Sequence, residues 1–493
     1  ANTTAANNTG VGYRALYTNT TGTRNIAIGP YAYDGSDTEN DNLAIGYQAM
    51  TTDTAGGSNN VAIGNYALDA LTSGDDNVAI GKDAGTTQTT ASSSVFIGSG
   101  AGEATTTGSD NTALGKDALK ANSTGANNTA VGHNALLTNT TATNNVAVGD
   151  SALKDNTTGA NNVAVGNNAL FENTTASDNT AVGVNAMLDN TTGATNVAIG
   201  KSALENNTTA SDNTAIGHDA LFTNTTGALN VAVGKDALYT NNASNNTAVG
   251  GRSLRLNTTG SGHTAIGWKT LETMATNHNS TAVGYHALKL TTVSDNTAVG
   301  SEALTVCSTG INNTGMGQSV LVACTTGNNN SALGFGAGSA VTTGVHNAIL
   351  GSGAGPSITE GGSNICIGRN SGADLTTGSQ NILIGYNSTI AGAAYGSTIV
   401  FGFGLTSKGD GTGMYGGSSV YNQGNTTAWQ QVSDIRIKKN VEDCNTGLDL
   451  INAINVKNFE YRTEDEITEL PKSNVVDKQG IQVGVIAQEL ETI

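Results

Sequence analysis

A serine and a lysine near the C-terminal end have the clearest capacity for covalent chemistry in this sequence. Ser433 and Lys438 lie five residues apart. A serine hydroxyl needs a base to take its proton, and a desolvated lysine amine with a lowered pKa can serve as that base. On spacing alone, the simpler interpretation is a turn serine followed by a solvated surface lysine.

Other polar side chains suggest metal chemistry only weakly. His133 and His218 each follow a repeated glycine, but they lie five repeats apart and cannot share a metal, so we expect surface histidines. Aspartate also precedes a repeated asparagine, and a calcium ladder there is conceivable. The spacing lacks the Gly-Gly-x-Gly-x-Asp pattern of calcium-binding β-rolls, so solvated turns are the better interpretation. These aspartates are Asp76, Asp110, Asp178, Asp212 and Asp295. We predict no metal and no cofactor.

The four cysteines do not predict a disulfide. Cys307 and Cys324 are 17 residues apart and should stack on adjacent repeats, close enough for a bond. Parallel, in-register side chains point the same way, however, so free thiols are favoured for this pair. The other two are Cys366 and Cys444.

Most of the histidines, aspartates and cysteines named above lie in a repeat that fills most of the chain. A glycine returns 24 times between Gly12 and Gly402, nearly always at intervals of 17 residues. A period this short makes each repeat one coil of a solenoid rather than a small domain. The unit reads Asn-x-Ala-(Val/Ile)-Gly-x-x-Ala-Leu, as at 162–170. We therefore predict an all-β, parallel β-solenoid of about 24 coils, with two short strands per coil and a length of about 110 Å.

Each position of the repeat carries its own expectation. We expect the aliphatic residue before the glycine and the leucine four residues after it to fill the core. The alanine two before the glycine forms a ribbon of small residues, which favours close packing against other copies in a homotrimer. This position carries a larger residue in the last four coils, at Ile349, Cys366, Leu383 and Val400, which predicts a wider cross-section of the coil there. The asparagine four before the glycine, present in 20 of 24 repeats, should form a hydrogen-bonded ladder.

Composition divides the chain into three segments, and net charge and hydropathy argue against two classes of partner, nucleic acids and membranes. The shaft spans 1–402, a Gly- and aromatic-bearing β connector or tip spans 403–432, and a small α+β segment spans 433–493 with 12 acidic and 7 basic residues. The helical pattern there involves Leu448, Ile451 and Ile454, and an alternating pattern predicts a strand over 456–461. The net charge of −18 argues against nucleic acid. No apolar run reaches about 18 residues, so membrane insertion is not expected.

Two resemblances to known families follow from these motifs. The Asn-x-(Val/Thr)-Ala-(Ile/Val)-Gly core over residues 8–402 resembles the head repeat of trimeric autotransporter adhesins, a trimeric left-handed parallel β-roll of shorter period. The segments 433–441 and 484–489 resemble the endosialidase-type intramolecular chaperone of phage tail fibres and tailspikes. The second resemblance implies trimerisation of a β-fibre followed by self-cleavage at Ser433, with Lys438 as the partner. Only the first part of such a domain is present, so we expect its helical remainder to be missing or to lie beyond Ile493 in a longer gene product.

These observations predict a structural virion protein, a trimeric phage tail fibre shaft that extends from the virion and contributes to host attachment. Its expected partners are two further copies, other tail proteins and a host cell-surface glycan or protein receptor. No substrate-directed enzyme activity is expected, only a single-turnover self-cleavage at Ser433. The alternative is a bacterial trimeric adhesin on the cell surface.

Overall fold

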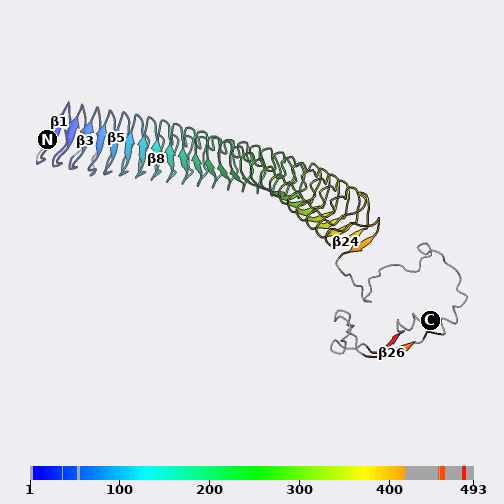
Figure 1. The fold of residues 1–493 in the computed structure, drawn as a ribbon. Helices are drawn as coiled ribbons and strands as arrows, with labels where there is room; N and C mark the ends of the chain where they lie inside the picture. Colours follow the sequence, from blue (N-terminus) through cyan, green and yellow to red (C-terminus); the bar gives the residue numbers. More distant parts are fainter. Residues whose placement is uncertain are drawn as a thin grey trace. The chain divides into compact units, whose positions relative to one another are not determined.

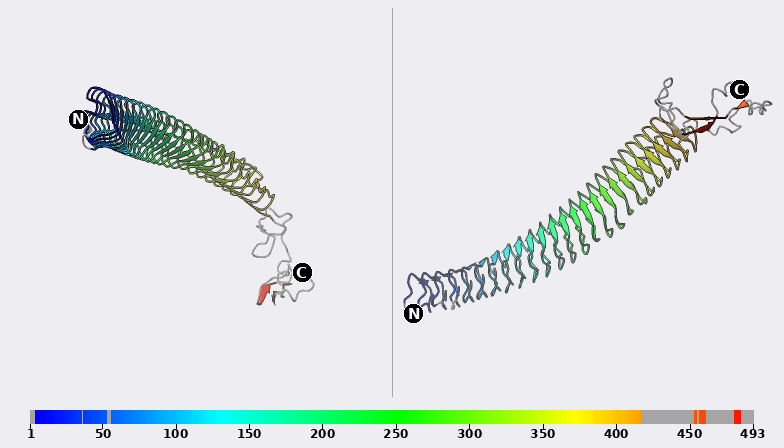
Figure 2. Two further views of the ribbon diagram at one scale, coloured as in Figure 1. Left: turned by 90° about the vertical axis from the view of Figure 1, so that its left-hand side faces the viewer. Right: turned by 90° about the horizontal axis from the view of Figure 1, so that it is seen from below.

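The computed structural model describes residues 4–35, 37–52, 56–416, 453–454, 456–460 and 480–484. They fall into two compact units, residues 1–418 and 419–493. The first unit is a stack of similar coils in one elongated solenoid (Figure 1). Two further views show that the strands form a continuous row along one side of the coils (Figure 2). The fold class predicted from the repeat, an all-β parallel solenoid with a 17-residue period, is confirmed.

Every coil contributes one three-residue strand to a 25-stranded parallel sheet. The strands of this sheet are β1 (Thr9–Val11), β2 (Ile26–Ile28), β3 (Leu43–Ile45), β4 (Val61–Ile63), β5 (Val78–Ile80), β6 (Val95–Ile97), β7 (Thr112–Leu114), β8 (Thr129–Val131), β9 (Val146–Val148), β10 (Val163–Val165), β11 (Thr180–Val182), β12 (Val197–Ile199), β13 (Thr214–Ile216), β14 (Val231–Val233), β15 (Thr247–Val249), β16 (Thr264–Ile266), β17 (Thr281–Val283), β18 (Thr297–Val299), β19 (Thr314–Met316), β20 (Ser331–Leu333), β21 (Ala348–Leu350), β22 (Ile365–Ile367), β23 (Ile382–Ile384), β24 (Ile399–Phe401) and β25 (Gly413–Tyr415). Neighbouring strands pair in repeat register, so that Ala164 lies opposite Ala181.

The prediction of two strands per coil is wrong for the described residues, because the second side of the coil has a left-handed backbone. Asn168 has a φ of 55° and Leu170 a φ of 52°, and both values recur at equivalent positions of other coils. Left-handed residues interrupt an extended strand. The coils still bond to each other on this side, since Leu170 N–H donates to the Ala186 carbonyl at 3.0 Å.

The core also differs from the sequence prediction in which strand residue faces inward. The alanine two before the glycine, such as Ala164, is fully buried, whereas the aliphatic residue next to the glycine, Val165, is 36% exposed. The leucine four after the glycine, such as Leu170, is fully buried as expected. The coil interior is narrow, so a small residue on the strand lets the leucine from the other side fill the space. The alanine ribbon therefore does not face another copy.

The predicted asparagine ladder is confirmed four residues before the glycine. Asn162 N–H donates to Oδ1 of Asn145 at 2.9 Å, and Asn179 N–H donates to Oδ1 of Asn162 at 3.0 Å. The amide of Asn162 donates to the Ala176 carbonyl at 2.9 Å. Each buried asparagine thus satisfies a strand-entry N–H and a turn carbonyl of the neighbouring coil.

A second asparagine ladder, seven residues after the glycine, was missed. These asparagines open the Asn-Thr-Thr-Gly stretches, which the sequence alone placed in an outer turn. Asn156 is fully buried, and its amide donates to Oδ1 of Asn139 at 3.1 Å and to the Gly159 carbonyl at 2.9 Å. The buried polar core therefore has two parallel hydrogen-bonded columns.

The described part of the second unit contains one antiparallel strand pair, β26 (Lys457–Phe459) and β27 (Gln482–Gly484). The strand predicted over 456–461 is confirmed at β26. The predicted helix around Leu448 and Ile451 lies outside the described residues. Among the residues that the structure describes, no helix is long and apolar enough to cross a membrane.

Candidate functional site

The predicted cleavage pair, Ser433 and Lys438, lies outside the described residues, so its geometry stays a prediction. The described strands of the same segment are β26 and β27. Asn458 and Val483 are opposed in this pair. The described part of the C-terminal segment therefore contains a strand pairing between residues about 25 positions apart, and it includes neither residue of the predicted cleavage pair.

The described thiols are unsuited to nucleophilic chemistry. Cys307, Cys324 and Cys366 are free and fully buried, as predicted for the first two. Cys307 and Cys324 occupy the second asparagine ladder, and the Cys307 Sγ lies 3.1 Å from the Gly310 carbonyl that an asparagine would bond. Burial raises the pKa of the Cys366 thiol to about 12, so it stays protonated.

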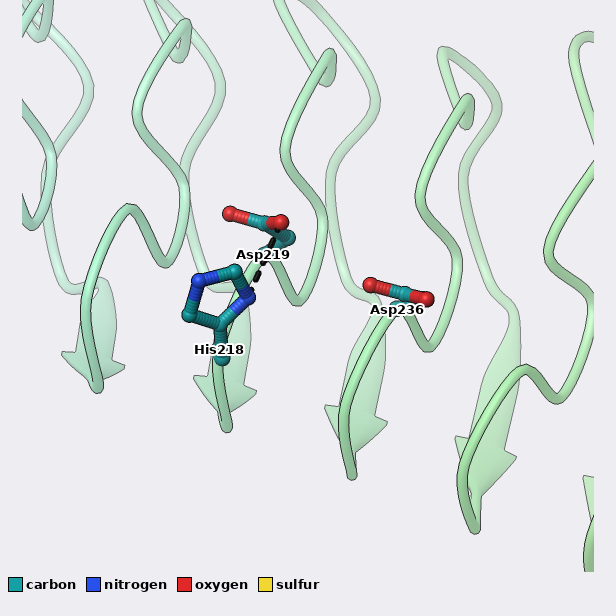
Figure 3. A group of neighbouring side chains, drawn as sticks. All are labelled: His218, Asp219 and Asp236. Atoms are coloured by element: carbon teal, nitrogen blue, oxygen red, sulfur yellow. Dashed lines mark ion pairs between the residues drawn. The ribbon is translucent and has the colours of Figure 1, made fainter.

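His218 belongs to the one cluster in the described part of the chain whose ligand atoms could reach a common metal. The potential ligand atoms of His218, Asp219 and Asp236 all lie within 4.8 Å of one another, and His218 Nδ1 is 2.9 Å from Asp219 Oδ2 (Figure 3). However, Asp236 also faces Arg252 Nε at 3.6 Å and Arg255 Nε at 3.9 Å. Two guanidinium groups already balance its charge and would repel a cation, so this cluster is better explained as a surface ion-pair network.

The other histidine and the aspartates behave as surface groups. His133 is about half exposed, and its Nδ1 lies 3.1 Å from Asp150 Oδ1. The aspartates before the repeated asparagine are exposed and have left-handed φ values near 60°, as the solvated-turn interpretation requires; these are Asp76, Asp110, Asp178, Asp212 and Asp295.

The largest candidate interaction surface is the outward face of the sheet. We call the residues one and three positions before each repeated glycine, together with their equivalents in β25, the outer strip. It includes Leu114, Ile199 and Leu333, which are 45%, 40% and 49% exposed. No residue of the strip is charged in any of the 25 strands. A continuous uncharged strip, apolar throughout in the row next to the glycine and often threonine in the other row, is thus exposed along a chain whose net charge is −18.

The strip contains a hollow and lies beside exposed aromatic residues. The hollow has a volume of about 290 Å³ and lies where Ser331 and Ala348 interrupt a row of larger side chains. Phe335, one residue after the repeated glycine of the same coil, is 61% exposed. Further along, Tyr386 and Phe403 stack with ring centroids 5.0 Å apart, and Phe403 is 77% exposed.

Comparison with known families gives one match. The family described as chaperone of endosialidase matches residues 433–493. No curated protein and no solved structure matches the chain. The chain therefore joins a parallel β-solenoid to a segment that is similar to an endosialidase chaperone.

Proposed function

We propose that this chain forms the shaft of a homotrimeric phage tail fibre, with the segment 433–493 acting as an intramolecular chaperone for trimerisation. The observation that carries the proposal is the match to the endosialidase chaperone family directly after a long β-solenoid. The properties that the described solenoid offers are reach and a repeated surface. This combination supports a structural, tail-fibre-like role on the virion.

The outer strip supports assembly into an oligomer. At sheet spacing it is about 110 Å long, so even a width of about 10 Å gives roughly 1,100 Å² of mostly apolar surface. The largest apolar patch on a typical monomer covers about 300–600 Å², and a stable interface buries about 800 Å² on each partner. A strip of this size is consistent with burial in an assembly.

The periodicity of the strip favours further copies of the same chain as partners. Its side chains recur at the sheet spacing of about 4.8 Å, and only a surface with the same spacing can match it over 25 strands. Three copies around a common axis would bury all three strips and leave the charged turns in water. This arrangement replaces the alanine ribbon as the basis for the trimer.

The proposed surface for host attachment lies in the last coils of the shaft. The exposed aromatic residues Tyr386 and Phe403, which lie outside the outer strip, offer planar apolar surfaces to a host glycan or protein receptor, and Arg369 lies over the Tyr386 ring. They fall in the last coils, next to the predicted 403–432 tip. Other tail proteins would bind elsewhere on the shaft.

The segment 433–493 would separate from the shaft by a single self-cleavage at Ser433. The Lys438 amine would take the proton of the Ser433 hydroxyl, and the hydroxyl oxygen would attack the carbonyl carbon of the peptide bond before Ser433. That C–N bond would break as the Ser433 nitrogen takes a proton from Lys438, and water would hydrolyse the resulting ester to separate the segment from the shaft. Denaturing intact mass of the full-length gene product, compared between wild type and Ser433→Ala, tests this step. We expect loss of the C-terminal segment only in the wild type. If both remain full length, the Ser433–Lys438 assignment fails and a non-cleaving fibre or the adhesin gains support.

A bacterial trimeric surface adhesin is the second candidate, favoured by the Asn-x-(Val/Thr)-Ala-(Ile/Val)-Gly repeat. It predicts a membrane-anchor domain of four β-strands per chain in the full gene product. The sequence of the complete gene therefore separates the two candidates.

A further inference from the structure

We infer that Phe335 of one copy inserts into the hollow beside Ser331 and Ala348 of the next copy, forming a specific lock in the shaft. This inference rests on the proposed trimer and adds to it a residue-level contact. It follows from the position of one hollow in the outer strip and one protruding ring beside the strip in the same coils.

The hollow arises from two small residues in the row three positions before the glycine. In this row Thr314 of β19 and Ile365 of β22 flank Ser331 of β20 and Ala348 of β21. Met316 and Leu333 contribute to its wall from the row next to the glycine. The hollow is lined mostly by apolar atoms and has a volume of about 290 Å³. An apolar cavity of about 150 Å³ holds benzene, so a phenyl ring fits.

Phe335 is well placed to supply that ring. It follows Gly334, the repeated glycine of the coil that contains Ser331, and it is 61% exposed. The equivalent position carries Lys116 or His133 in some coils and an exposed aromatic residue, such as Trp268, in others, so Phe335 is distinguished by its place beside the hollow. Exposure of its ring to water costs free energy in a monomer. Burial of the ring against another chain removes this cost.

The symmetry of a trimer brings these two features together. Each strand crosses the outer face from the residue three before the glycine toward the residue after it. In a cyclic trimer the interface is heterologous, so one edge of a strip meets the opposite edge of its neighbour at the same height. The edge carrying Phe335 then faces the neighbour's edge carrying Ser331 and Ala348. The hollow is lined by residues of β19 to β22, and Ser331 of β20 belongs to the coil of Phe335, so no shift in register is needed.

A cross-linking experiment on the full chain tests this contact. Phe335→Cys and Ala348→Cys are introduced together in a Cys444→Ser background, because the other three cysteines are buried. After mild oxidation, we expect a covalent trimer on a non-reducing denaturing gel that disappears on reduction. The matched control is Phe335→Cys with Thr343→Cys, since Thr343 is exposed in the outer turn of the same region. This control should run as a monomer.

Light scattering on the unoxidised variants separates this inference from the proposed function. A trimer in solution that gives no Phe335–Ala348 cross-link, or one that cross-links equally well through Thr343, overturns the lock and leaves the trimeric shaft standing. A monomeric shaft overturns both. In addition, filling the hollow by Ala348→Phe should shift the assembled species toward monomer, whereas Thr343→Phe should not.

Discussion

The ring of Phe96 occupies the space that a leucine takes in other coils, and Gly102 leaves that space open. A Cβ atom on Gly102 would lie 2.7 Å from the ring of Phe96. Phe96 stands where most coils have alanine, and Gly102 stands where most have leucine. Phe96 also approaches the glycine of the preceding coil, since a Cβ on Gly85 would lie 2.9 Å from its ring, and Ile349 approaches Gly338 in the same way, at 2.9 Å from Cδ1. Larger strand residues, including those near the C-terminal end, can thus be accommodated inside the coil by loss of volume opposite them.

This exchange predicts strong coupling between Phe96 and Gly102. Phe96→Ala should cost about 3–5 kcal/mol through the cavity it leaves. Gly102→Leu should destabilise through its clash with the ring, although its φ of +59° is one that Leu119 adopts at 54° in the next coil. The double variant recreates the common Ala–Leu pair and should recover most of the loss. Guanidinium unfolding measures all three, and additive losses would contradict the exchange.

His263 gives the shaft a predicted acid sensitivity. It replaces an asparagine of the first ladder, its Nε2 donates to the Asn277 carbonyl at 2.6 Å, and its Nδ1 accepts from Ser280 N–H at 3.2 Å. Burial lowers the pKa of His263 in the folded state. The unfolded chain therefore binds the proton first, so stability should fall as the pH drops below about 6.5, by at most about 1.4 kcal/mol per pH unit.

Hydrogen exchange of the coils around His263 at several pH values tests this sensitivity locally. His263→Asn restores the usual ladder residue and should remove this contribution to the acid-dependent loss of protection. His133→Asn is the control, because His133 is exposed and bonds no backbone group in the described structure. If His263→Asn leaves the local pH dependence unchanged, the buried imidazole is not its source.

The repeat determines much of this fold in advance, but not which side of each strand faces inward. The 17-residue period predicts the coil, the parallel register and the first ladder, because these depend only on spacing. The strand in 163–165 is apolar on both faces, so hydrophobicity placed Val165 inside instead of Ala164. The constant small size of the alanine, beside a position that varies between Val and Thr, is the signal that could have indicated a narrow interior. The Ser433–Lys438 pair depends on contacts that spacing does not define.

The repeated glycine, such as Gly166, is the position of the repeat where we expect a side chain to be least tolerated. Its φ is +138°, and a Cβ there would lie 2.4 Å from the Gly183 carbonyl oxygen. Because the obstacle is backbone of the next coil, a side chain cannot be accommodated by rotation. Gly166→Ala should therefore destabilise by several kcal/mol, combining backbone strain of about 1–3 kcal/mol with the clash. We expect hydrogen exchange to lose protection first in the coils on either side.

Gly336 provides the matched control for this requirement. Its φ is +60°, nothing lies within 4 Å of its Cβ position, and equivalent positions carry residues such as Asn168 at a φ of 55°. Gly336→Asn should consequently leave unfolding and exchange nearly unchanged. Equal losses for both variants would mean that glycine content, rather than the approach of neighbouring coils, sets the stability. A loss confined to Gly166→Ala would assign the repeated glycine to the close stacking of one coil on the next.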